Sequence, residues 1–156
     1  DNFLSVDILT LSKENYGREI HGLDSAKLLA SLVFQEALCE YGQDLKHQQQ
    51  LSEALADIFT LIYTAGSVIS RARQSQSNHE ISDMSSVITR IFTAESLLKI
   101  KSLSNICLNK IFEENIPNET AQFVQSLESI MTLNTDTISL KQSLADFMYT
   151  KNNYPF

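Results

Sequence analysis

The most constraining feature of the sequence is a regular apolar repeat within residues 41–72. Apolar side chains recur at alternating spacings of four and three residues, which places them on one face of an α-helix. The repeat consists of Leu51, Leu55, Ile58, Ile62, Ala65, Ile69 and Ala72. A polar repeat with the same spacing contains Glu53, Asp57, Thr60, Thr64, Ser67 and Arg71. The segment therefore predicts one long amphipathic helix that buries its apolar face against other helices.

The rest of the chain contains few residues that break helices. Its 156 residues include four glycines and two prolines, and 43% of them are hydrophobic. We therefore expect an all-α fold, an antiparallel bundle of four to five helices. Residues 1–23 lack a clean period and are expected to be an irregular lead-in, and residues 24–156 are expected to form a single domain.

The other helices are expected at about residues 25–40, 82–113, 119–133 and 138–150. Asp24 is the predicted N-cap of the first, Gly42 marks a break before the long helix, and Pro117 ends the third. The expected buried face of the first helix contains Leu28, Leu29, Leu32, Val33 and Ala37. That of the third contains Met84, Val87, Ile88, Ile91, Leu98, Leu103, Ile106 and Ile111.

Charge and cysteine content exclude some classes of function. The net charge of −7 argues against nucleic-acid binding, because no strongly basic face is available to neutralise phosphates. The same charge argues against simple electrostatic adhesion to an anionic membrane. Cys39 and Cys107 both stand in apolar helical patterns, so two reduced, buried thiols are favoured over a disulfide or a metal pair.

No known catalytic signature occurs in the sequence. The glycines are isolated, so there is no glycine-rich phosphate loop, and no metalloprotease or nucleophile motif is present. His21, His47 and His79 have polar neighbours and are typical of surface histidines. The sequence thus predicts no catalytic, cofactor-binding or metal-binding residue in this chain.

Four polar residues are candidates for an interface or for structural hydrogen bonds: Asp57, Tyr63, Arg71 and Glu95. Glu95 falls on the expected inward face of the third helix, where its carboxylate needs a donor or becomes neutral. A structural hydrogen bond is favoured over a binding site, and Tyr63 is better placed as the donor than Arg71, which lies about 18 Å away along the helix. Arg71 ends the polar repeat, where structural pairing and an interface both stay open.

The same segment resembles the C-terminal helical domain of very-long-chain acyl-CoA dehydrogenases and their bacterial relatives. The resemblance rests on Gly42, Gln48 to Gln50, Leu55-Ala56-Asp57, Tyr63 and Ile69-Ser70-Arg71-Ala72, followed by a polar loop and Glu95-Ser96. Residues 41–72 match this pattern without a gap. Beyond about residue 101 only the composition is similar.

The resemblance implies a non-catalytic role for this chain. Members of the family are flavoenzymes that oxidise acyl-CoA thioesters at the α,β bond, with FAD and a glutamate base in a larger upstream part. We therefore expect a non-catalytic accessory domain without its own FAD, whose partners are its own catalytic region and a second subunit in a homo-oligomer. Peripheral membrane association through the parent is compatible with this role. The alternatives are a free-standing helical interaction module and, less favoured, a small enzyme.

Overall fold

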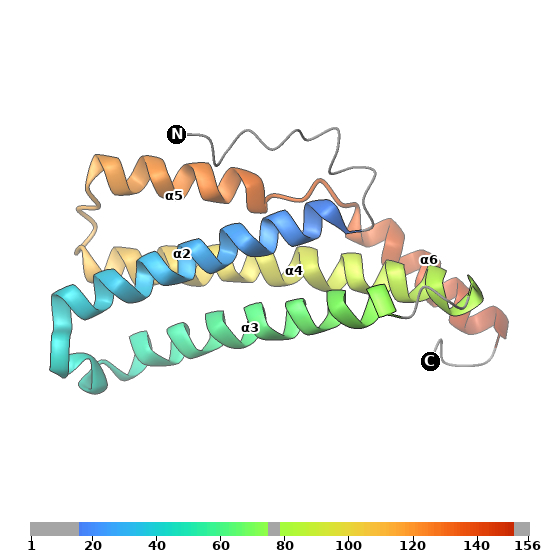
Figure 1. Cartoon of the computed structure of the whole chain (residues 1–156), viewed down its shortest axis with the longest axis horizontal. Coiled ribbons are helices and arrows are strands. Elements are labelled where there is room, and N and C mark those ends of the chain that lie inside the picture. The colour runs from blue at the N-terminus through green and yellow to red at the C-terminus, as the bar shows by residue number, and fades with distance from the viewer. Residues whose placement is uncertain (1–15, 75–78, 152–156) are drawn as a thin grey trace.

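The computed structural model describes residues 16–74 and 79–151 (Figure 1). Over these residues the chain forms five α-helices, one short 3-10 helix and no strand. The elements are α2 (Gly17–Tyr41), η1 (Gly42–His47), α3 (Gln49–Gln74), α4 (His79–Ile111), α5 (Asn118–Met131) and α6 (Thr137–Lys151). The predicted all-α fold is confirmed.

The first four α-helices run antiparallel to one another in chain order and form an elongated bundle (Figure 1). α3 packs most extensively on α4, while α2 lies against α3, α4 and α5. α6 continues beyond the end of α5 and packs on the N-terminal half of α4 (Figure 1). This is the expected antiparallel bundle of four to five helices.

The apolar repeat of α3 faces the core, as predicted. Six of its seven members are buried, and Ile62 is partly buried between two hydrophobic clusters. The larger cluster fills the middle of the bundle, and the smaller one lies where α2 begins and α3 ends. The smaller cluster contains Tyr16, Leu23, Ala65, Ile69 and Ala72. Because each fully buried large apolar side chain contributes about 1.5–3 kcal/mol to the stability of the fold, these two clusters stabilise the bundle.

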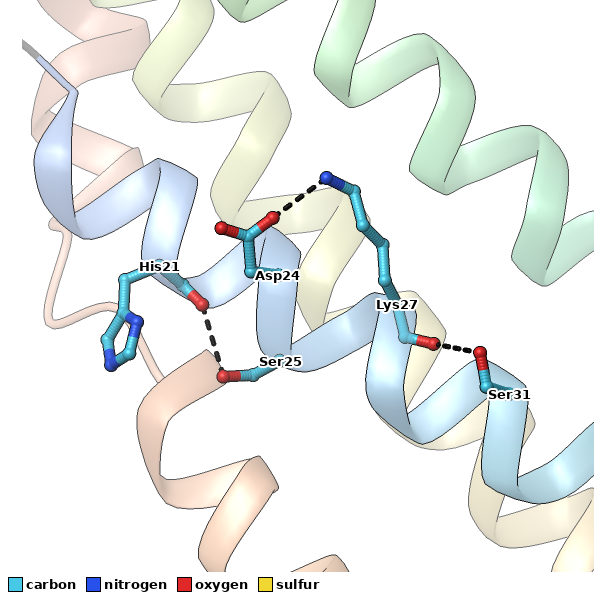
Figure 2. Close-up of polar contacts among 5 residues, drawn as sticks. All are labelled: His21, Asp24, Ser25, Lys27 and Ser31. Atoms are coloured by element: carbon cyan, nitrogen blue, oxygen red, sulfur yellow. Dashed lines mark hydrogen bonds and ion pairs between the residues drawn. The ribbon is translucent and has the colours of Figure 1, made fainter. Parts of the chain in front are cut away.

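The first helix begins earlier than the sequence indicated. α2 starts at Gly17, so residues 17–23 are helical rather than irregular, and residues 1–15 lie outside the described residues. Tyr16 precedes the helix with a left-handed φ of 67°, and its carbonyl accepts the N–H of Ile20 at 2.9 Å. The prediction of Asp24 as N-cap is wrong, because Asp24 lies inside α2 and pairs with Lys27 at 2.8 Å (Figure 2).

The break predicted at Gly42 is present. Gly42 has φ 50° and ψ −121°, which only glycine adopts without strain, and its N–H closes α2 on the carbonyl of Leu38. Residues 42–47 then form a 3-10 helix instead of the first turns of the long helix. The long helix therefore begins at Gln49 rather than at residue 41.

The buried face of α4 differs from the expected one. Leu98 is 68% exposed and Ile106 is 59% exposed, whereas both were expected inside. The buried stripe holds Thr89, Ile91, Thr93, Ser96, Leu97, Ile100, Ser104, Cys107, Leu108 and Ile111, of which Ile91 and Ile111 were expected there. Its small hydroxyl side chains let neighbouring helices approach, and the hydroxyl of Thr89 donates to the carbonyl of Ser85 at 2.7 Å. Leu28 of α2 is also 44% exposed, while Leu29, Val33 and Ala37 are buried as predicted.

Candidate functional site

The structure separates the four polar candidates. Asp57, Tyr63 and Arg71 are exposed along α3, and Glu95 is exposed on α4. Tyr63 and Arg71 both line one groove, while Asp57 and Glu95 do not. The structure therefore brings two of the four candidates to a common surface.

The prediction that Glu95 faces inward is wrong. Its side chain is 51% exposed and forms an ion pair with Lys141 of α6 rather than a hydrogen bond with Tyr63. The neighbouring Ser96 takes the buried position instead. An exposed ion pair of this kind contributes at most about 1 kcal/mol, so Glu95 helps to place α6 rather than to stabilise the core.

A groove of about 800 Å³ lies between α2 and α3. Its apolar surface comes from Leu23, Phe59 and Ile62, and polar side chains stand around it. The complete lining is Leu23, Lys27, Phe59, Ile62, Tyr63, Gly66, Ser67, Ser70, Arg71 and Gln74. Eight of these ten residues belong to α3, so the same helix that builds the core also presents a surface.

Small residues of α3 leave this space open. Gly66 has no side chain, and a methyl group added there meets only the Leu23 Cδ2 atom, at 3.5 Å. The hydroxyl of Ser67 turns back to its own helix and donates to the carbonyl of Tyr63 at 2.9 Å. At Phe59 the ring packs edge-to-face on Phe34 of α2, with centroids 6.0 Å apart. Tyr63 is 76% exposed, so its ring is available for contact.

The charged residues of the groove are cationic. Lys27 and Arg71 line it, and no carboxylate belongs to its lining as the described residues define it. Figure 2 shows the Lys27 ammonium paired with Asp24 on the surface of α2, and the Asp24 side chain is 57% exposed. Arg71 is exposed and already has an interaction within the chain. Both cationic groups therefore already have partners within the chain.

The arginines share one end of the bundle. The sequence has four, namely Arg18, Arg71, Arg73 and Arg90. They stand at the start of α2, at the end of α3 and in the first half of α4, and Arg90 lies 3.9 Å from the carboxylate of Glu19. Glu19 of α2 and Glu80 and Asp83 in the first turns of α4 belong to the same end, so acidic and basic residues are interspersed there.

The described residues contain no cluster of side chains suited to holding a metal ion. No three His, Cys, Asp or Glu side chains among them gather around one point. The imidazole of His21 points to a different side of α2 from Asp24 and Lys27 (Figure 2). Cys39 is exposed, contrary to the prediction, whereas Cys107 is buried and burial raises the pKa of its thiol to about 11.

Sequence reasoning identified Tyr63 and Arg71 but missed the groove. Phe59 and Tyr63 could have indicated a binding surface, since both are aromatic residues outside the apolar repeat of α3. The same helix is long and apolar enough to cross a membrane, judged by length and composition alone. Six of the seven residues of the apolar repeat of α3 are buried in the bundle, but only 22% of the apolar window is.

Comparison with known proteins identifies the family. No curated protein and no solved structure matches the chain significantly. The family model described as "Acyl-CoA dehydrogenase, C-terminal domain" matches residues 25–117, which is more than half of the chain and covers α3, α4 and most of α2. Domains of this family usually form one part of a multi-domain, oligomeric enzyme. The chain therefore belongs to the acyl-CoA dehydrogenase C-terminal domain family.

Proposed function

We propose that this helical accessory domain packs on the catalytic part of an acyl-CoA dehydrogenase-like flavoprotein and supports its assembly into dimers. The parent reaction is the FAD-dependent α,β-dehydrogenation of long-chain acyl-CoA, as in the very-long-chain enzymes that residues 41–72 resemble. FAD and the catalytic base belong to the catalytic part, and this chain contributes surfaces. Attachment of the parent to a membrane is a further role compatible with such surfaces.

The observation that carries this proposal is the amount of apolar surface left exposed on the bundle. Large exposed hydrophobic side chains occur on every α-helix from α2 to α6. They are Leu28, Phe34, Leu38, Phe59, Tyr63, Phe92, Leu98, Ile106, Phe123, Ile138 and Tyr149. Scattered exposed apolar residues are ordinary, but aromatic residues beside a groove mark surfaces that meet another protein. Family membership supports this choice of partner, since domains of this family usually form one part of a larger enzyme.

The proposal is tested by deleting residues 1–156 from the complete gene product. We expect the remaining protein to keep its flavin absorption, because this chain supplies no group to the cofactor. We also expect it to lose thermal stability and to sediment as a smaller species than the complete protein. A complete product without flavin, or one whose assembly is unaffected by the deletion, would favour a free-standing interaction module instead.

A further inference from the structure

We propose that α6 is a strap, a helix that releases from α4 as one unit while α2 to α5 stay folded. Its release uncovers an apolar strip on the N-terminal half of α4. This inference goes beyond the proposed function, because it concerns the motion of one helix within this chain and needs no catalytic part.

The helix α6 lies on the surface of the bundle. None of its side chains that the structure describes, from Thr137 to Tyr149, is buried. Ile138 and Tyr149 are largely exposed. The half-buried apolar side chains are Leu140, Leu144, Phe147 and Met148. Their spacing places them on one face of the helix, and this face is the one that packs on α4.

The helix α5 is a matched comparison, since it has 14 residues and α6 has 15. Val124, Leu127 and Met131 of α5 are buried in the larger hydrophobic cluster. The helix packs on both α2 and α4, and the amide of Asn105 donates to the carboxylate of Glu128 at 2.7 Å. Release of α5 would therefore open the core, whereas release of α6 would not.

The ion pair between Glu95 and Lys141 shows which part of α4 lies beneath α6. Both side chains are about half exposed, so the pair itself adds little stability. From Lys141 onward α6 runs antiparallel to α4, toward its N-terminus (Figure 1). Ile88 and Ile91 share the face of Glu95, at spacings of seven and four residues. Ile91 is buried and Ile88 is half-buried, and these two residues form the covered strip.

The strap has a fixed base. The ammonium of Lys101 in α4 donates to the hydroxyl of Thr132 at 2.9 Å, which ties the end of α5 to α4. Residues 132–136 then connect α5 to α6 without helical structure. The carboxylate of Asp136 accepts the backbone N–H of Ser139 at 3.0 Å and its hydroxyl at 2.7 Å, so it caps the start of α6. The motion is therefore confined to the chain after Thr132.

The length of α6 makes its release cooperative. A helix of about 15 residues is marginal in water without tertiary packing, so α6 loses its helical hydrogen bonds once it leaves α4. Proteins open locally in such units, and the units with the fewest buried contacts open at the lowest free energy. Release of α6 should therefore be visible in the exchange of its backbone amides.

The experiment is hydrogen exchange of the 156-residue chain, with each amide corrected for its intrinsic rate. We expect the amides of α6 to exchange at least about tenfold faster than those of α5. Equal protection of the two helices would overturn the strap.

A pair of substitutions tests whether the packed face holds the strap. Leu144→Ala removes the centre of that face, keeps a good helix former, and should speed exchange in α6 by about tenfold while α5 is unchanged. Gln142→Ala, at an exposed position of the same helix, is the matched control and should change neither rate. Equal acceleration of α5 and α6 by Leu144→Ala would place α6 in the same cooperative unit as the core and overturn the proposal.

Thiol labelling tests whether the strip is uncovered. The exposed Cys39 is replaced first (Cys39→Ser), and Ile88→Cys then reports on the strip. Leu103→Cys, half-buried on the C-terminal half of α4, is the control. Adding Leu144→Ala should speed labelling at position 88 by about the same factor as amide exchange in α6, with position 103 unchanged. Unchanged labelling at 88 would mean that α6 frays without leaving α4, and faster labelling at both positions would mean that the bundle itself opens; either result would overturn the strap.

Discussion

Replacing Gly22 by alanine adds one methyl group at the place where α2 meets both α4 and α5. The new Cβ atom would lie 2.8 Å from the Cδ1 atom of Leu97, a contact too short to persist. On its other side the carbonyl oxygen of Ile130 and the Cα atom of Met131 lie at 3.8 Å. Leu97 is fully buried, so its side chain has little room to turn away.

Two opposing effects determine the stability of the Gly22→Ala variant. Alanine is favoured over glycine inside a helix by about 1 kcal/mol. Overpacking of a core costs about 1–3 kcal/mol. The Gly22→Ala variant should therefore range from unchanged stability to a loss of about 2 kcal/mol.

Gly66 provides the matched control in the neighbouring helix. A methyl group there lies 3.5 Å from the Leu23 Cδ2 atom, which is an ordinary contact. The Gly66→Ala variant should therefore gain the full helical preference of about 1 kcal/mol. Because this preference is common to both sites, the two variants should differ by about 1–3 kcal/mol, which is the cost of the contact with Leu97.

The assay is urea unfolding followed by helical circular dichroism, with the slope of each transition compared to confirm that only stability has changed. Thermal midpoints should separate by about 2–4 °C for each kcal/mol in a chain of this length. Equal stabilisation by both substitutions would refute the close packing of α2 on α4 at Gly22.

Four further predictions concern particular residues. Thr93 is fully buried and its hydroxyl has no hydrogen-bond partner among the described residues, so Thr93→Val should raise the free energy of unfolding by about 1 kcal/mol. A lower free energy of unfolding in urea melts would show that the hydroxyl does have a hydrogen-bond partner. Gly42 has a positive φ, and a methyl group added there would meet no atom within 4 Å, so Gly42→Ala should cost about 1–2 kcal/mol through backbone strain alone, and an unchanged melt would contradict it. Cys39 should react with a thiol reagent in the native chain, while Cys107 should react only on unfolding. Because its folded pKa is raised from 9.0 to about 11, Cys107 should also make the unfolding free energy fall as pH rises between these values, since the unfolded state loses the proton first; a Cys107→Ala variant should lack that component.

The sequence predicted α3 well because its apolar and polar residues separate cleanly. Leu55 and Ile58 fall on one face and Asp57 on the other, so period and burial agree. α4 misled the same reasoning because its buried stripe contains hydroxyl residues. Thr93 and Ser104 are buried there, while the larger apolar side chains Leu98 and Ile106 are exposed. The periodicity of a sequence reflects the polarity of its side chains, but not the space available between the packed helices.

The groove could not be predicted from one segment, since it joins residues distant in the sequence. Leu23 and Lys27 come from α2, whereas Tyr63 and Arg71 come from α3. The polar repeat of α3 drew attention to Arg71, but nothing in α2 indicated which of its residues would face it. The pair between Glu95 and Lys141 was missed for the same reason, because Lys141 belongs to α6 and its packing depends on the tertiary fold.

In the proposed role, this chain is a packing domain whose partner holds the flavin. The most direct test mixes the purified chain with the separately expressed remainder of the gene product and follows both by sedimentation. We expect saturable association, with flavin absorption carried only by the partner before mixing and by the complex afterwards. Absence of association, or flavin that stays with this chain alone through gel filtration, would contradict it.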